Sequence, residues 1–217
     1  MLIDSYKNQI INADFREVLK NLPDKSVDLL LTDPPYGIDI LGQRAKKDPH
    51  GKYGYTVFGN KEWDCQRPSK EDFEEMIRVS KNQVIWGGNY FADLLPASQG
   101  WFVWDKGQRD FSLADGELAW TSFDKALRIF TCSRSKALQD GKIHPTQKPV
   151  ALFEWVLRLR TKENDLILDC YSGSATTAIA CHRAGRNFIC IERDIEYYKK
   201  SVQRLQDEIA QMRLLRC

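Results

Sequence analysis

Apolar residues along this chain form either short runs or stripes with helical spacing, and the two kinds of segment alternate. Gln9 to Ala13 is short and rich in apolar residues, whereas Asp14 to Leu22 carries its apolar residues at helical spacing. Val27 to Leu31 is a mainly apolar run, typical of a strand that is covered on both faces of a parallel sheet. The N-terminal segment therefore predicts a strand, a helix and a second strand.

The middle of the chain contains shorter apolar runs. Val84 to Trp86 and Trp101 to Trp104 are each followed by a turn that contains glycine. Leu118 to Phe123 and Leu127 to Thr131 suggest a hairpin about Asp124-Lys125. These runs predict further strands.

The last third of the chain repeats the α/β pattern. Val150 to Arg160 predicts an amphipathic helix, and Ala175 to Ala184 predicts another helix that ends at Gly185. Leu166 to Asp169 and Phe188 to Ile191 predict buried strands. Both ends of the chain thus indicate an α/β fold.

The C-terminal residues form one long apolar stripe with spacings of three and four. Its members are Ile195, Tyr198, Val202, Leu205, Ile209 and Met212. Such a stripe fits either a coiled-coil seam or a helix laid on the sheet. Because few heptads are available, we expect a helix on the sheet, in a protein that is a monomer or a homodimer.

Length and composition bound the class of protein. The 217 residues suffice for one domain with a modest insertion, and 42% apolar with 29% charged residues excludes disordered, collagen-like and coiled-coil chains. No run approaches the ~20 apolar residues of a membrane span, and the polar N-terminus lacks the apolar core of a signal peptide. We therefore expect a single domain over residues 1–217, without a membrane segment, in the cytoplasm.

Neither a metal site nor a disulfide framework is predicted. The six cysteines contain no C-x-x-C pair, and His50, His144 and His182 have neither metal-ligand spacing nor a Ser-His-Asp order. The segment Lys142 to Pro149 is better explained as a polar loop before a helix than by His144 acting as a general base. Hydrolases and metalloenzymes are therefore disfavoured.

The net charge of +2 is small, but positive charge gathers in two stretches. Leu41 to Arg67 has little apolar periodicity and an excess of three positive charges, and Lys125 to Lys148 has an excess of five. A long polar loop in a compact domain is usually functional or disordered. On one face the two stretches would bind nucleic-acid phosphates, and a solvated lysine-rich surface is the alternative. The residues expected to contact phosphates are Arg44, Lys46, Lys47, Lys52, Arg134 and Lys136.

The sharpest local feature is Asp33-Pro34-Pro35-Tyr36, which follows an apolar strand, where parallel α/β sheets bind their ligands. The prolines hold the chain extended and supply no N–H, so the Asp33 carboxylate and the Pro34 carbonyl are acceptors on a stiff frame. This pair, beside an aromatic ring, suits the exocyclic NH₂ of a planar base, whose lone pair it would free for attack. The alternative is that the prolines end a strand and Tyr36 packs.

A second feature runs from a strand through a turn of small residues into a helix, over Asp169 to Thr177. Backbone approaches a ligand closely at such a turn, and helix N-terminal amides can meet a carboxylate. The turn lacks G-x-G-x-x-G, but Glu192 follows about twenty residues later, where an acid accepts ribose hydroxyls. The two features together indicate an adenosine-containing cofactor; a tight turn with a surface glutamate is the alternative.

These segments together resemble the β class of DNA amino-methyltransferases, a circularly permuted group of bacterial and phage enzymes. Asp33 to Tyr36 resembles the catalytic tetrapeptide, Asp169 to Thr177 the S-adenosylmethionine loop (usually D-P-F-x-G-S-G-T-T), and His144 to Pro149 the H-P-T-Q-K-P segment. The resemblance covers nearly the whole chain. It implies a Rossmann-like α/β fold with a mostly parallel seven-stranded sheet and helices on both faces. The chain would start mid-sheet and supply the cofactor strands last.

The resemblance also implies roles for individual residues. Asp33, Pro34, Pro35 and Tyr36 would be catalytic, and Asp33 would also touch the cofactor. The other cofactor-binding residues would be Asp14 and Phe15 at the adenine, Glu192 at the ribose, Thr146, Gln147 and Lys148 near the carboxylate, and Asp169, Tyr171, Gly173, Ser174 and Thr176 of the loop. Cys170, Tyr171 and Ala175 replace the family's proline, phenylalanine and second glycine. Ala175 would weaken cofactor binding if its position needs a positive φ.

The implied reaction is methyl transfer from S-adenosylmethionine to the exocyclic amino group of a base in double-stranded DNA, adenine N6 in the first place. Because that atom is paired and stacked, the base would be flipped into the pocket, where Tyr36 stacks on it. Cytosine N4 is the nearest alternative, although the family more often has serine in place of Asp33 for cytosine. An RNA methyltransferase and a nucleic-acid-binding scaffold without catalysis are further alternatives. The insertion around residues 41–67 would recognise the DNA.

Overall fold

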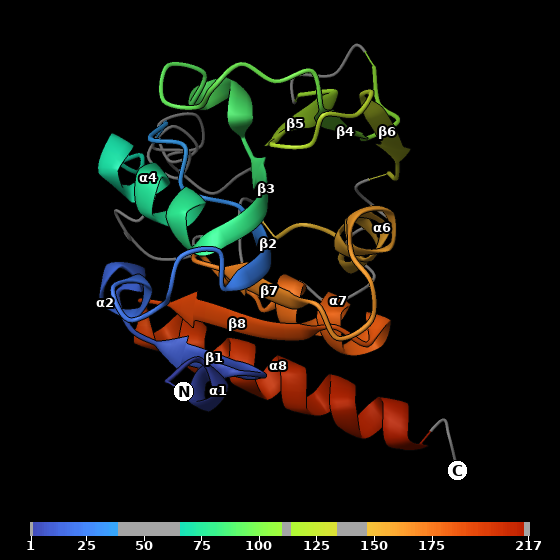
Figure 1. Cartoon of the computed structure of the whole chain (residues 1–217). Helices are drawn as coiled ribbons and strands as arrows, with labels where there is room; N and C mark the ends of the chain where they lie inside the picture. Colours follow the sequence, from blue (N-terminus) through green and yellow to red (C-terminus); the bar gives the residue numbers. More distant parts are fainter. Residues whose placement is uncertain (1, 39–65, 110–113, 134–146, 215–217) are drawn as a thin grey trace, which may run out of the picture.

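A computed structural model of the chain describes residues 2–38, 66–109, 114–133 and 147–214. The described residues form one sheet between two layers of helices (Figure 1). The strands are β1 (Gln9–Asn12), β2 (Val27–Thr32), β3 (Ser80–Trp86), β4 (Trp101–Asp105), β5 (Gly116–Thr121), β6 (Arg128–Thr131), β7 (Leu166–Asp169) and β8 (Asn187–Glu192). The helices are α1 (Leu2–Tyr6), α2 (Phe15–Leu19), α4 (Lys70–Val79), the 3₁₀ turn η2 (Gly88–Tyr90), α6 (Val150–Arg160), α7 (Thr176–Ala184) and α8 (Ile195–Leu214).

The sheet is mostly parallel, which confirms the predicted α/β class. Its strand order is β1-β8-β7-β2-β3-β5-β4-β6, and β5 alone runs against its two neighbours. Strand β2, which precedes the predicted catalytic tetrapeptide, therefore lies beside β7, which leads into the predicted cofactor turn. A hydrogen bond of 2.8 Å from Thr32 Oγ1 to Asp169 joins the ends of these strands across 137 positions of sequence. The two predicted motifs are thus far apart in the sequence but adjacent in space, because their strands are neighbours in the sheet.

The sheet differs in three details from the predicted one. It has eight strands instead of seven, and the chain begins at its edge with β1 and not in its middle. The predicted hairpin is absent from the described residues, because β4 lies between β5 and β6. The Trp104 indole of β4 donates to the carbonyl oxygen of Cys132, 2.8 Å away, next to the end of β6. Two short apolar runs beside a turn do not specify which strand each will pair with.

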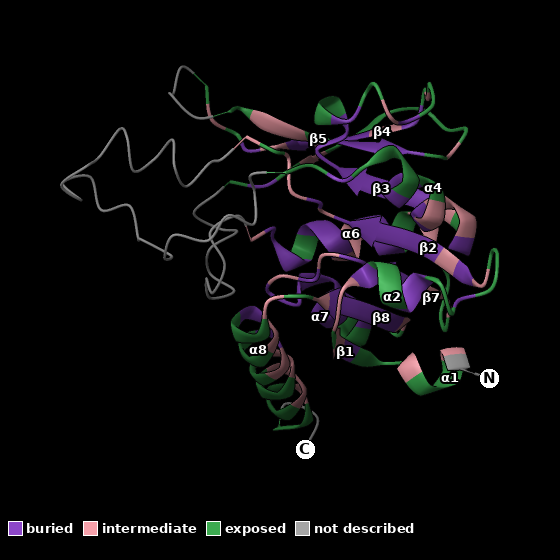
Figure 2. Ribbon diagram, turned by 90° about the vertical axis from the view of Figure 1, so that its left-hand side faces the viewer, coloured by how far each residue is buried: buried purple, intermediate pink, exposed green. Residues whose placement is uncertain are grey.

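Helices cover both faces of the sheet, as predicted. On one face, Phe153 of α6 and Ile179 of α7 share a core cluster with Leu29 and Leu31 of β2. On the other face, α2 and α4 pack in the cluster that contains Leu30. Successive side chains of a strand point to opposite faces, so a strand covered on both sides is apolar at successive positions. The central strands β2, β7 and β8 are accordingly mostly buried, whereas β6 at one edge of the sheet is mostly exposed (Figure 2).

The C-terminal stripe forms helix α8, which packs on β1, β8 and α7, as expected of a helix on the sheet. Helices α1 and α4 are not among the predicted elements. A capping box between Ser69 and Asp72 marks the start of α4, and this signal is readable in the sequence. Within the described ranges, no helix has both the length and the apolar character that a membrane span requires.

Candidate active site

A cavity of about 650 Å³ opens at the carboxyl ends of the parallel strands β1, β2, β7 and β8. This is where open α/β sheets bind ligands, and the volume suits a small molecule. The predicted residues that line it are Asp14, Phe15, Asp33, Pro35, Gln147, Lys148, Asp169, Tyr171, Gly173, Ser174, Thr176 and Glu192. Pro34 and Tyr36 lie beside the cavity without lining it, and Thr146 lies outside the described residues.

Asp169 fastens the turn at residues 170–175. Its carboxylate accepts hydrogen bonds from Thr32 Oγ1 at 2.8 Å, from the Tyr171 N–H at 3.0 Å and from Thr177 Oγ1. Burial raises the pKa of Asp169 to about 6, although all three donors favour its charged form. Asp169 thereby ties the turn to β2 and to the first turn of α7.

Ala175 adopts the left-handed conformation that favours glycine, with φ +63° at the N-cap of α7. An L-residue in this region costs about 1–2 kcal/mol. The side chain is fully buried in the core, and burial of its methyl group offsets part of this cost. Position 175 therefore needs a positive φ, which is the condition under which Ala175 is expected to weaken cofactor binding.

Glu192 ends β8 and presents a carboxylate at the cavity. Its Oε2 accepts the Gly173 N–H and its Oε1 the Asp194 N–H, both at 2.8 Å. Burial raises the pKa of Glu192 to about 6, against the effect of these two backbone donors. Each carboxylate oxygen has room for a second donor, so Glu192 can also accept hydroxyl groups from a ligand.

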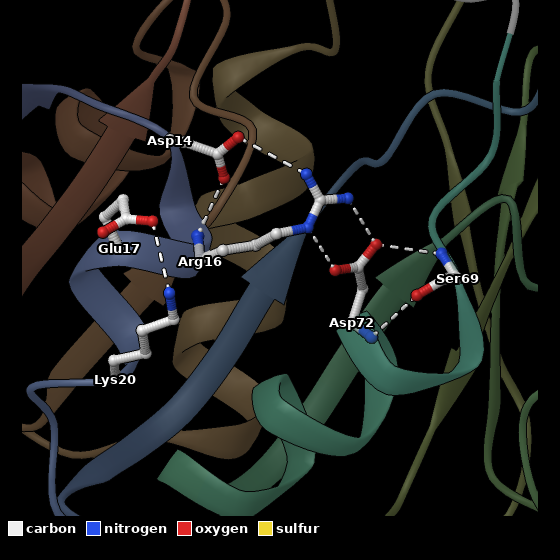
Figure 3. Close-up of polar contacts among 6 residues, drawn as sticks. All are labelled: Asp14, Arg16, Glu17, Lys20, Ser69 and Asp72. Carbon is white, nitrogen blue, oxygen red and sulfur yellow. Dashed lines mark hydrogen bonds and ion pairs between the residues drawn. The ribbon is translucent and has the colours of Figure 1, made fainter.

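The opposite wall of the cavity is positioned by an ion-pair network between α2 and α4 (Figure 3). Asp14 caps α2 by accepting the Arg16 N–H at 3.0 Å, and the Arg16 guanidinium makes paired bonds of 2.6 and 2.7 Å to Asp72. Asp72 is almost fully buried and also bonds Ser69 at the start of α4. Burial alone would raise the pKa of Asp72, but the hydrogen bonds from Arg16 and Ser69 outweigh it and hold this pKa below its usual value. The Phe15 ring, 5.1 Å from Tyr171, adds an apolar wall.

Asp33 follows β2 with both carboxylate oxygens in hydrogen bonds. Oδ1 accepts the Tyr36 hydroxyl at 2.7 Å, and Oδ2 accepts from Lys148 Nζ at 2.5 Å. Lys148 Nζ also lies 3.1 Å from the Tyr36 oxygen. Burial raises the pKa of Asp33, and the charge of Lys148 opposes this shift. Lys148, expected near the cofactor carboxylate, thus contacts the predicted catalytic tetrapeptide and lines the cavity as well.

Two charged residues outside the predicted site extend this cluster. Glu117 of β5 lies 3.0 Å from Lys148 Nζ and 2.7 Å from the Nζ of Lys106. Burial opposes ionisation, but the two lysines lower the pKa of Glu117 to about 2. Acids and bases alternate from Asp33 to Lys106, so their charges cancel where little water reaches. The turn after the apolar run Trp101 to Trp104 is the sequence signal that could have indicated Lys106.

The predicted DNA contacts remain predictions. Arg44, Lys46, Lys47, Lys52, Arg134 and Lys136 lie outside the described residues, as does the insertion except for Gln66 and Arg67. Arg128 of the second basic stretch begins β6, which runs parallel to β4. Arg128 and the preceding Lys125 therefore lie at the amino edge of the sheet, opposite Asp33. In the described ranges no cluster of three His, Cys, Asp or Glu side chains is suited to a metal ion.

Comparisons with known proteins agree with this geometry. Residues 60–203 match the model of a DNA methylase family of N6 and N4 methyltransferases. The chain is 27% identical to the type II methyltransferase M2.LlaDCHI of Lactococcus lactis subsp. cremoris, over 90% of this chain and 88% of that protein.

Among solved structures, the M1.HpyAVI complex with S-adenosylmethionine superposes with a TM-score of 0.59 and 25% identity, over 91% of this chain and 98% of that one. The cytosine-N4-specific PvuII DNA methyltransferase shares the fold, with a TM-score of 0.62 and 19% identity, over 90% of this chain and 85% of that one. The Rossmann-like methyltransferase fold is thereby confirmed.

Proposed function

Since the chain belongs to the DNA methylase family of N6 and N4 amino-methyltransferases, we propose that it methylates N6 of adenine in double-stranded DNA. Membership makes the protein a DNA amino-methyltransferase with S-adenosylmethionine as its cofactor. The step from amino-methylation to adenine is supported by Asp33, because the family more often has serine there when cytosine is the target.

The residues of the cavity fit S-adenosylmethionine. Phe15 and Tyr171 offer apolar walls for the adenine ring, and Glu192 offers acceptors for the ribose hydroxyls. The turn at 170–175 brings backbone close to the ligand near the N-terminus of α7, where a carboxylate is favoured. When bound, the cofactor supplies an electrophilic methyl group.

The observation that carries the proposal is the placement of Asp33. Its carboxylate lines the cofactor cavity and is fixed in direction by Tyr36 and Lys148. Each carboxylate oxygen can accept one more hydrogen bond, and the Pro34 carbonyl is a second acceptor on the same stiff segment. An exocyclic NH₂ that donates to both would turn its lone pair out of the ring. The carboxylate would stabilise the positive charge that develops on nitrogen during attack.

Lys148 and Glu117 support the position and charge of Asp33, since Lys148 bonds Asp33 and Glu117 contacts Lys148. Burial raises the pKa of Asp33, and the charge of Lys148 opposes this shift by favouring the ionised carboxylate, while Glu117 lies 3.0 Å from Lys148 Nζ on the other side. A set of charges fixed in this way needs little rearrangement when charge develops on the base. The two residues therefore support the acceptor geometry without touching the base.

The substrate base must leave the duplex for this chemistry. The N6 atom of adenine is paired and stacked in DNA, so the nucleotide has to be flipped out of the helix. Tyr36 lies next to Asp33 and offers an aromatic ring on which the flipped base stacks. This places the amine beside Asp33 and Pro34.

The test is the chemical identity of the product. Unmethylated duplex DNA is treated with the protein and S-adenosylmethionine, sequenced, and digested to nucleosides for mass spectrometry. We expect N6-methyldeoxyadenosine at one sequence motif, and none from Asp33→Ala, while the exposed Asp124→Ala serves as the control with full activity. N4-methyldeoxycytidine as the main product would reject adenine and keep the mechanism. Methylation of RNA in preference to DNA would reject the DNA substrate.

A further inference from the structure

The Tyr36 ring already has a stacking partner, Tyr90. Their ring centroids lie 4.7 Å apart with the planes 14° from parallel. Tyr90 ends the 3₁₀ turn η2, which follows β3 almost directly, and 39% of it is exposed. A flipped base cannot stack on this face of Tyr36 while Tyr90 occupies it.

Tyr90 differs from the other described ring neighbours of Tyr36 in being exposed. Gly87 is buried, and a Cβ there would lie 2.1 Å from Tyr36 Cε1, so its backbone presses on the ring. Phe91 contacts the Tyr36 ring edge-on at 6.1 Å, is fully buried and packs on Phe73. Gly87 and Phe91 are parts of the core, whereas the Tyr90 side chain can rotate away from the ring.

The backbone of Tyr90 is fixed independently of its side chain. Arg67 donates from Nη1 to the Tyr90 carbonyl oxygen at 3.0 Å and forms a paired ion bridge of 2.8 and 2.5 Å with Asp93. The Tyr90 N–H donates to the Gly87 carbonyl oxygen at 2.8 Å. Rotation of the ring therefore leaves the turn in place.

The cofactor cavity stops short of this stack. Asp33 and Pro35 line the cavity, whereas neither Tyr36 nor Tyr90 is among the described residues that do. The space for the cofactor is thus preformed, while the space beside the Tyr36 ring is filled by a side chain of the protein. The filler is aromatic and planar, as a base would be.

We propose that Tyr90 holds the place of the target base on Tyr36 and is exchanged for that base when it flips into the site. The inference rests on the proposed function. Before DNA binds, the stack keeps the Tyr36 ring covered and its hydroxyl on Asp33, 2.7 Å away. When the base arrives, one aromatic stack replaces another, and Tyr90 turns toward the surface. Tyr90 is a positioning residue that sets how readily the base is accepted.

Substitutions at Tyr90 test the exchange. Tyr90→Ala removes the competitor, so kcat/KM for DNA should rise by about 2- to 10-fold, the factor that corresponds to one aromatic pair. Tyr90→Phe keeps the stack and should match the wild type. Affinity for S-adenosylmethionine should be the same in all three proteins, which also shows that the variants are folded.

A second readout follows the base itself. A duplex with the motif found by sequencing carries 2-aminopurine at the target position, and its fluorescence rises when the base leaves the stack. At saturating protein, Tyr90→Ala should give a stronger signal than the wild type and Tyr90→Phe. An equal or lower kcat/KM together with an unchanged or weaker signal in Tyr90→Ala would overturn the exchange. Absence of methyl transfer by the wild type would instead overturn the proposed function.

Discussion

Asp169 and Glu192 end the neighbouring strands β7 and β8, and their different hydrogen-bond partners give the two carboxylates different roles. Burial raises the pKa of both Asp169 and Glu192 to about 6. The Asp169 carboxylate accepts hydrogen bonds from within the fold, from the hydroxyls of Thr32 and Thr177 and from the backbone N–H of Tyr171. Glu192 accepts two backbone N–H groups and keeps capacity for a ligand. Glu192 is therefore the acid through which pH should act on cofactor binding.

We expect affinity for S-adenosylmethionine to fall as pH drops from 7 to 5. The ribose hydroxyls prefer the ionised form of Glu192, so binding favours deprotonation and weakens as pH falls through about 6. Glu192→Gln should bind about 10-fold more weakly at pH 7, the value of a hydrogen bond to a charged group, with a flatter pH profile. Titration calorimetry from pH 5 to 8 measures both. Since Asp169 titrates in both proteins, parallel profiles would exclude Glu192 as the acid responsible.

Two glycines separate the effect of backbone strain from that of contact with Tyr36. Gly87 and Gly107 both have positive φ, +73° and +61°, but a Cβ at 87 would collide with the Tyr36 ring and one at 107 meets nothing within 4 Å. Gly87→Ala should lower the rate of methyl transfer at least ~10-fold, because misplaced catalytic geometry is costly. Gly107→Ala should lose only about 1–2 kcal/mol of unfolding free energy and keep its rate. Equal rates in the two variants would show that the position of Tyr36 is unimportant.

At the scale of elements, α8 contacts the turn at 170–175, which we predict to bind the cofactor. Arg204 donates to the Ser174 carbonyl oxygen at 2.7 Å, and Glu208 pairs with Arg183 of α7 at 2.7 and 2.8 Å. Val202 and Leu205 pack, half-buried, against the core. The helix thus supports the turn at 170–175 as well as the sheet.

Leu205→Asp should lower the free energy of unfolding by about 2 kcal/mol, since it places an unpaired carboxylate in an apolar seam. Gln206→Asp is the matched control, because Gln206 is exposed on the same helix and should change stability by less than about 0.5 kcal/mol. Urea denaturation gives both values. A Leu205→Asp protein of normal stability that has lost a dimer in sedimentation would make the stripe an interface between chains.

At the scale of the whole molecule, the proposed role of Asp33 and the polarity of the sheet together predict the direction from which DNA approaches. Seven of the eight strands in the described residues point their carboxyl ends to one edge, where Asp33 and Glu192 lie. Lys125 and Arg128 lie at the other edge. A duplex that delivers a base to Asp33 must meet the carboxyl edge.

We expect Lys46→Ala with Lys47→Ala to reduce the dependence of DNA affinity on salt, by about one unit of slope for each lysine that contacts a phosphate. The methylated motif should stay the same, since phosphate contacts carry no sequence information. Lys125→Ala with Arg128→Ala removes the same charge from the amino edge and should leave the slope unchanged. The two slopes are obtained by measuring DNA affinity from 50 to 300 mM salt, about the range where such contacts dominate. A larger decrease in the salt dependence for Lys125→Ala with Arg128→Ala than for the Lys46 and Lys47 substitutions would place the DNA on the amino edge.

The sequence by itself determined most of the alternation of strands and helices, and it indicated which residues at strand ends are candidates for the chemistry. Asp33-Pro34-Pro35-Tyr36, the turn at 170–175 and Glu192 could be read directly, because proline, glycine and hydrophobic period act between neighbours along the chain. The predicted cofactor-binding residues within the described ranges line one cavity. Local patterns suffice wherever the relevant partner is a few positions away.

Only the tertiary structure decided which distant residues meet. Strand order places β4 between β5 and β6, brings Lys148 to Asp33 across 115 positions, and sets Glu117 behind Lys148. The stack of Tyr90 on Tyr36 arises in the same way, from the pairing of β2 with β3. Such contacts depend on strand order and register, which follow from packing of the whole core and leave no periodic trace in the sequence.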